Sequence, residues 1–75
     1  MPSPQEVENL ILQGIPNAKV AVEDLKGDGA HFDIKVICSD FSGKNMIEQH
    51  QMIYAALGDA MKDEIHAVQL STSEN

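Results

Sequence analysis

The side chains in this sequence best suited to binding a metal are three histidines and a single cysteine. His31 follows residues 27–29 (GDG), which read as a turn because glycine adopts positive φ freely and aspartate can bond its own backbone. A turn has no use for an imidazole, so the histidine at the first position of the next strand, His31, calls for an explanation. His66 begins a later apolar stretch, His50 lies in a helical pattern, and Cys38 lies in a strand pattern.

Each of these residues also has a purely structural interpretation. His31 can be read as a surface residue beside a turn, and His66 as a hydrogen-bonded histidine among apolar neighbours. His50 lies on the apolar side of its helix and is interpreted as a core or interface histidine with its hydrogen bonds satisfied. Cys38 is in phase with the apolar residues of its strand, which predicts a small buried side chain without reactivity.

Length, charge and cysteine content limit the classes of protein to which this chain can belong. A chain of 75 residues predicts one domain over residues 1–75 with a small core. Its 12 acidic residues outnumber five lysines, and there is no arginine, so the net charge of −7 argues against nucleic acid as a partner. Without a membrane-spanning run, a signal peptide or a second cysteine for a disulfide, the sequence predicts a cytoplasmic protein that does not bind membranes. No Ser, His and Asp arrangement suggests a nucleophile, so we do not expect an enzyme.

Hydrophobic periodicity predicts five elements in the order α, β, β, α, β. They cover residues 4–13, 17–26, 32–39, 44–57 and 65–70, and residues 59–63 are compatible with a further helical turn. The two tails, residues 1–3 and 71–75, are expected to be flexible. The glycine turn joins the first two strands into an antiparallel hairpin.

Such an order implies fold class α+β, with a three-stranded mixed sheet and the helices packed on one of its faces. The sheet can bring the start of the second strand, with His31, near the start of the third strand, with His66. The longer helix is expected to carry an apolar stripe at spacings of three and four. Its members are Ile47, His50, Tyr54, Leu57 and Met61, with Met46 and Ile53 beside them.

Three motifs follow one another in a fixed order: GDGAHF, then DFSGKNMIEQHQMIY, then IHAVQL. The second contains a Phe-x-Gly-Lys element and a His-Gln-x-x-Tyr stretch. In this order and spacing the motifs resemble the BolA family of small proteins, over roughly residues 4–70. The resemblance implies the αββαβ arrangement related to the class II KH fold. It also implies partnership with a monothiol glutaredoxin, with which a BolA protein shares a bridging 2Fe-2S cluster together with glutathione.

The resemblance implies two histidine ligands in this chain. His66 corresponds to the family histidine near the C-terminus, and His31 is the best candidate for the hairpin-loop ligand, which in the family is Cys or His. A two-iron cluster needs four protein-type ligands, conventionally thiolates, so a chain with one cysteine cannot hold the cluster by itself. We therefore expect no cofactor on the isolated chain, and an apo form that is a monomer or a weak homodimer.

Two other functions stay open. The KH-like fold allows a nucleic-acid-binding transcriptional regulator, with Gly43 and Lys44 as the contact residues. The Gly-x-x-Gly clamp of KH domains is absent, however, and Gln49 stands where family members commonly carry arginine. The third function is a metal-free adaptor that recruits a basic partner through its acidic surface and the edge of the third strand.

Overall fold

The computed structural model describes residues 3–27, 31–58 and 67–75. The elements are α1 (Pro4–Gly14), β1 (Lys19–Asp24), β2 (His31–Ile37), the short 3-10 helix η1 (Ser39–Phe41), α2 (Met46–Leu57) and β3 (Ala67–Ser73). This order confirms the predicted αββαβ arrangement and the α+β class. The helical turn expected at residues 59–63 lies outside the described residues.

Helix α1 begins where the sequence predicts. The Ser3 hydroxyl oxygen accepts the Glu6 backbone N–H at 3.2 Å, and Pro4 occupies the first turn, where its missing N–H costs nothing. Val7 and Ile11 lie one turn apart on one face of the helix and are both fully buried. The helix therefore contributes a narrow apolar stripe to the core.

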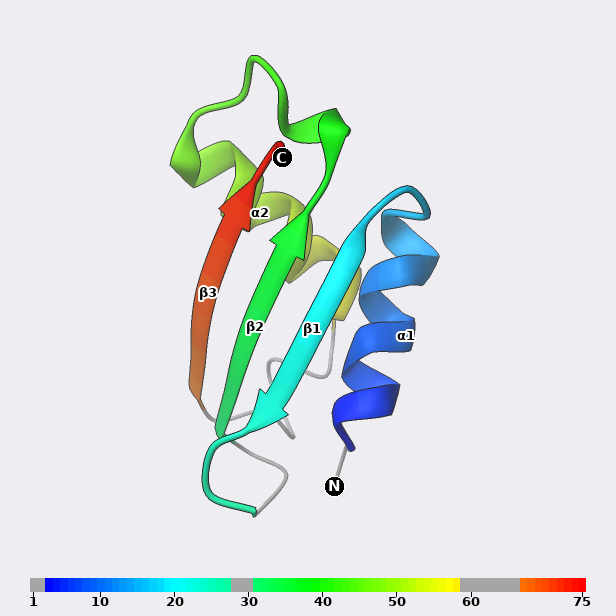
Figure 1. Ribbon diagram of the computed structural model, residues 1–75, viewed down its shortest axis with the longest axis vertical. Coiled ribbons are helices and arrows are strands. Elements are labelled where there is room, and N and C mark those ends of the chain that lie inside the picture. The colour runs from blue at the N-terminus through cyan, green and yellow to red at the C-terminus, as the bar shows by residue number, and fades with distance from the viewer. Residues whose placement is uncertain (1–2, 28–30, 59–66) are drawn as a thin grey trace.

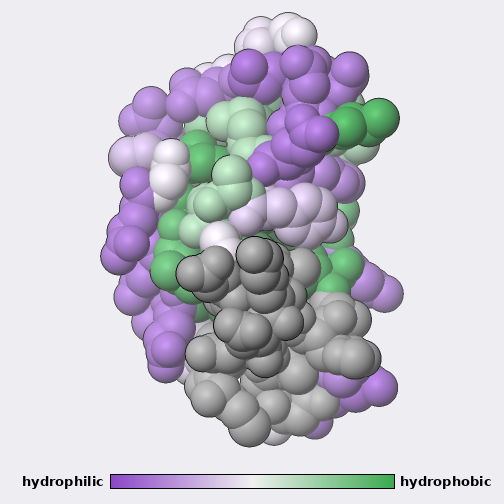
Figure 2. All heavy atoms as spheres, turned by 180° about the vertical axis from the view of Figure 1, so that it is seen from behind, coloured by the Kyte–Doolittle hydropathy of each residue, from purple (hydrophilic) through white to green (hydrophobic). Residues whose placement is uncertain are grey.

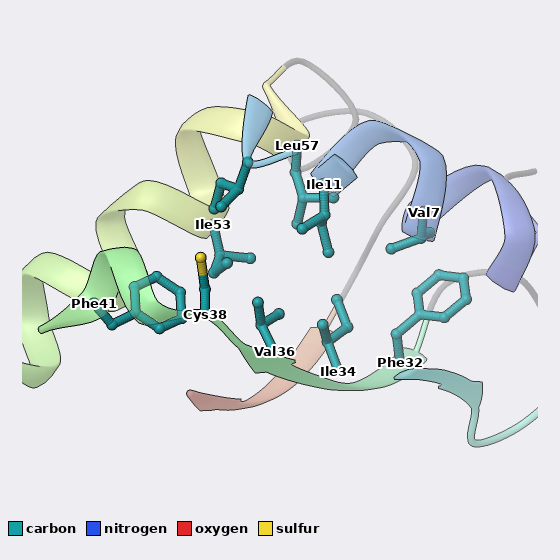
Figure 3. Close-up of a cluster of buried hydrophobic side chains, with 10 residues drawn as sticks. Val7, Ile11, Phe32, Ile34, Val36, Cys38, Phe41, Ile53 and Leu57 are labelled. Atoms are coloured by element: carbon teal, nitrogen blue, oxygen red, sulfur yellow. The ribbon is translucent and has the colours of Figure 1, made fainter. Parts of the chain in front are cut away.

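The three strands form one mixed sheet in the order β1-β2-β3. β1 and β2 pair antiparallel, with Lys19 opposite Ile37, and β2 and β3 pair parallel, with His31 opposite Ala67. Figure 1 shows β2 at the centre and β3 at one edge. Both helices cover the same face of the sheet, as Figure 3 shows, so the predicted layer arrangement is confirmed.

The core lies between β2 and the two helices (Figure 3). Alternate residues of β2 are buried, as a strand covered on one face requires. The core cluster consists of Val7, Ile11, Ile15, Phe32, Ile34, Val36, Cys38, Phe41, Ile53 and Leu57. Cys38 is 1% exposed, which confirms its predicted burial. Ala18, Val20 and Val22 pack against this cluster from the first strand segment, also as predicted.

The predicted stripe of α2 is partly wrong. Leu57 and the flanking Ile53 are buried, but Ile47 is 69% exposed, Met46 55% and Tyr54 41%. The helix carries apolar residues on several faces, so spacing alone does not select the one that packs. Figure 2, which views the molecule from the side opposite to that of Figure 1, shows apolar side chains exposed among hydrophilic ones. Met61 lies outside the described residues.

The C-terminal prediction also needs correction. Residues 71–73, expected to belong to a flexible tail, continue β3 to Ser73. They pair in register with residues 35–37 of β2, and the Cys38 N–H donates to the Ser73 carbonyl at 2.9 Å. Backbone pairing with β2 over its full length extends β3 beyond its apolar residues. None of the helices within the described ranges is long and apolar enough to cross a membrane.

Candidate metal-ligand site

His31 is the first residue of β2, as predicted, and its side chain is half-buried. Its backbone carbonyl accepts the Leu25 N–H at 2.8 Å, which holds the end of the hairpin closed. At the end of β1, Asp24 Oδ1 accepts hydrogen bonds from the N–H groups of Lys26 at 3.4 Å and Gly27 at 3.0 Å. Gly27 has φ 69°, a conformation that favours glycine. These bonds fix the backbone where the loop begins and where β2 starts.

The start of β3 lies beside His31. Ala67, the first residue of β3, is the register partner of His31 in the parallel pair. His66 is bonded directly to Ala67 in the chain and lies outside the described residues. The expectation that the second and third strands start next to each other is confirmed, whereas the approach of the two imidazoles stays a prediction.

Two acidic residues face each other near this end of the hairpin. Glu23 of β1 is the register partner of Asp33 of β2. The neighbours of Asp33 in β2 face the helices, so this acidic pair lies on the opposite face of the sheet. Like charges directly opposite each other on one face of a sheet are unfavourable. Among the described residues, however, no group of three His, Cys, Asp or Glu side chains is placed to hold a metal ion. This part of the chain does not form a complete metal site of its own.

Cys38 lies far from His31. It follows the last residue of β2, seven positions from His31, and at about 3.3 Å per residue this is roughly 23 Å along the strand. Its burial among apolar side chains also keeps it from solvent. The structure therefore does not bring the only cysteine together with His31.

His50 lies near that same distant end of the sheet. Its chain neighbour Gln49 accepts a hydrogen bond from the Thr72 hydroxyl, and Thr72 is the register partner of Val36 near the end of β2. The Nε2 atom of His50 is buried and has no hydrogen-bond partner among the described residues. The prediction of a fully satisfied histidine is wrong for this nitrogen.

Gly43 and Lys44 lie in the loop that leads into α2, also away from His31. Gly43 has φ 79°, and Lys44 is exposed. The Gln49 side chain bridges this loop to β3, since its Nε2 donates to the Lys44 carbonyl at 2.9 Å and its Oε1 accepts from Thr72 at 2.6 Å. Sequence reasoning missed this bridge because Gln49 and Thr72 are 23 residues apart and follow no local spacing rule.

The family model described as "BolA-like protein" matches residues 14–75. The chain belongs to the BolA-like family. Protein BOLA2 of Arabidopsis thaliana is 32% identical to it over 75 residues, covering 99% of this chain and 80% of that protein. A bolA protein homologue from Coxiella burnetii has a similar structure, with a TM-score of 0.82 and 34% identity over 97% of this chain and 91% of that one.

A third relative carries a functional name. The "DNA-binding transcriptional regulator BolA" of Escherichia coli strain K12 is 30% identical over 46 residues, which covers 61% of this chain and 44% of that protein. The family membership confirms the resemblance drawn from the three motifs, and the Coxiella structure matches the observed fold.

Proposed function

We propose that this BolA-like protein binds a monothiol glutaredoxin and supplies His31 and His66 as ligands to a bridging 2Fe-2S cluster. The observation that carries the proposal is the register of the parallel strand pair, which sets His31 opposite the residue that follows His66. Consecutive Cα atoms are about 3.8 Å apart, so a single peptide unit separates His66 from the register partner of His31.

The donor set of the chain supports a shared cluster. Four ligands are required, and thiolates are the usual ones. Cys38 is buried at the other end of β2 and His50 lies on α2 near that end, which leaves His31 and His66 for this site. The remaining ligands must come from thiols outside this chain, namely those of glutaredoxin and glutathione. Neutral imidazoles in place of thiolates would raise the reduction potential of such a cluster.

The proposal places a specific requirement on the backbone. Side chains alternate along a strand and register partners share a face, so a regularly extended β3 would direct residue 66 to the face opposite His31. Joint ligation of one cluster therefore requires the chain to depart from extended geometry immediately before Ala67. A test must consequently treat the two histidines separately.

The test is anaerobic reconstitution with a monothiol glutaredoxin, glutathione, iron and sulfide, followed by visible absorption and circular dichroism. We expect a heterocomplex spectrum with the wild type, and the glutaredoxin-only spectrum with His31→Ala or His66→Ala. His50→Gln is the matched control, because it removes an imidazole from the other end of the sheet. Wild-type spectra for both alanine variants would refute histidine ligation, and loss with His66→Ala alone would remove His31 from the ligand set.

One observation favours a second function, nucleic-acid binding. The Escherichia coli relative is named a DNA-binding regulator, and Lys44 of this chain is exposed beside the start of α2. If this loop contacts phosphates, Lys44→Ala should weaken binding in a gel shift at low salt, because each lysine lost reduces counterion release. Lys26→Ala removes another exposed lysine, at the hairpin, and serves as the control. Equal effects of the two variants, or no shift at all, would count against this function.

A further inference from the structure

The two edges of the sheet differ in charge. β1 forms one edge and carries Lys19, Glu23 and Asp24. β3 forms the other edge, and its sequence AVQLSTS contains no charged residue and no proline. Natural edge strands commonly carry charges or proline, because bare backbone groups invite another strand to pair. In a chain with 23% charged residues, β3 lacks this protection.

The backbone of β3 shows which residues face outward. The Ser73 carbonyl accepts the N–H of Cys38, so Ser73 faces β2, and every second residue before it does the same. The intervening residues, Val68, Leu70 and Thr72, then direct their N–H and C=O groups to the free edge. Among the strands that the structure describes, none pairs with β3 on this side.

We propose that β3 pairs antiparallel with β3 of a second copy of this chain, about a two-fold axis at Leu70. A hydrogen-bonded ladder can form only in registers that place residues with outward N–H and C=O groups opposite each other. A two-fold axis at Leu70 meets this condition and pairs the strand over its whole length. Leu70 then faces Leu70 of the second copy, and Val68 faces Thr72 of the second copy. Each of these pairs would exchange two hydrogen bonds, and the two sheets would become one continuous sheet.

The absence of charge on β3 fits a second copy of the chain as the occupant. Two chains with a net charge of −7 repel each other, and they can approach most closely through surfaces without charge. The proposed register also places Gln69 opposite Ser71 of the second copy, which is a neutral polar pair. A basic partner, in contrast, would find no carboxylate on this strand.

An exposed apolar side chain adds to this surface. Met46 is 55% exposed, and its sulfur lies 3.4 Å from the Thr72 hydroxyl, so it stands beside the C-terminal part of β3. Because Thr72 is set opposite Val68 of the second copy, Met46 would cover Val68 of that copy on the helix side of the sheet. Val68 is half-buried within its own chain.

The dimer is expected to be weak. One pair of seven-residue strands is expected to bury less than the roughly 1,000 Å² of stable interfaces, which is typical of weak and transient association. Salt should strengthen the dimer, because it screens the repulsion between two acidic chains. An interface held by ion pairs would show the opposite salt dependence.

The test uses two variants of equal design on the exposed face of β3. Gln69→Lys with Ser71→Lys sets a lysine of one copy opposite a lysine of the other in both 69–71 pairs. The same variant makes the net charge less negative and so lowers the overall repulsion between the two chains. Gln69→Glu with Ser71→Lys sets opposite charges together in the same register. Gln13→Lys with Gln51→Lys adds the same charge as the first variant at exposed helix positions and is the control.

Sedimentation equilibrium from about 10 μM to 1 mM would measure association, with circular dichroism to check folding. We expect about tenfold weaker association for the double-lysine variant of β3, tighter association for the Glu/Lys variant, and no weakening for the control. Concentration-dependent amide shifts at Val68, Leu70 and Thr72 would locate the interface. A wild type that stays monomeric at about 1 mM, or equal association of the two β3 variants, would overturn the proposal.

Discussion

Replacing Cys38 with serine separates the packing of the core from ligation of a cluster. Cys38 is 1% exposed and lies beside Phe41 and Ile53 (Figure 3). A serine hydroxyl at this position exchanges a small apolar group for a polar one in an apolar site, at a cost of about 1–3 kcal/mol. For a domain of this size, each 1 kcal/mol lowers the Tm by about 4–8 °C. We therefore expect the Tm of Cys38→Ser to fall by roughly 4–24 °C.

The same variant should leave the proposed cluster unchanged. The Cys38 sulfur lies at the opposite end of β2 from His31, so its loss removes no ligand. The assay combines thermal unfolding by far-ultraviolet circular dichroism with visible circular dichroism of the glutaredoxin complex, recorded well below the variant's Tm. His31→Ala is the reciprocal variant: its side chain is only half-buried, so it should change the Tm little and abolish the heterocomplex spectrum.

Two results would refute this reasoning. A wild-type Tm for Cys38→Ser would mean that the site accommodates a hydroxyl, which contradicts an apolar environment around the sulfur. A folded Cys38→Ser protein without the heterocomplex spectrum would make Cys38 a ligand and would contradict the separation along β2.

Three further predictions test the helices and the site. Asn45→Ala removes the N-cap of α2 and its capping box with Glu48, and should cost about 0.5–2 kcal/mol in urea unfolding. Gly14→Ala would place a Cβ 2.8 Å from the Ala56 Cβ, so it should destabilise by about 1–3 kcal/mol, and Ala56→Gly in the same chain should recover part of this loss. A stabilising effect of Gly14→Ala alone would contradict the close helix contact. Because ligating imidazoles must be unprotonated, heterocomplex absorbance should be retained at pH 8 and fall as the pH is lowered to about 5.5. An unchanged spectrum with both proteins folded would count against histidine ligands.

Much of this fold follows from local patterns in the sequence. The Ser3 cap, the alternation from Phe32 to Cys38 and the glycine turn each have a local physical cause, and each predicted element is found within a few residues of its expected place. His31 was placed correctly at the first residue of β2 because the turn before it is marked by its glycines. The position of His31 and of the strand next to it was thus predictable, whereas its role as a ligand stays a prediction.

The remaining features depend on contacts between distant parts of the chain. The burial of Ile53 rather than Ile47 is decided by how α2 meets the sheet, and the close approach of Gly14 to Ala56 is part of that docking. The extension of β3 through Ser73 is decided by backbone pairing with β2, to which polar side chains are no obstacle. The spacing of residues within one element therefore predicts neither which residues of α2 are buried nor where β3 ends.

The two candidate functions of this chain are separated along the sheet. His31 and Ala67 mark the end where β2 and β3 begin, whereas Lys44 lies in the loop after the other end. A parallel strand pair keeps these ends apart by the full length of β2, which at seven residues is roughly 20 Å. Cluster ligation at the His31 end therefore blocks nucleic-acid binding at the Lys44 loop only if the bound partner is large enough to cover both ends of the sheet. Binding of glutaredoxin and of DNA to the same molecule would show that the surfaces are independent, and mutual exclusion would show that the bound glutaredoxin reaches the Lys44 loop.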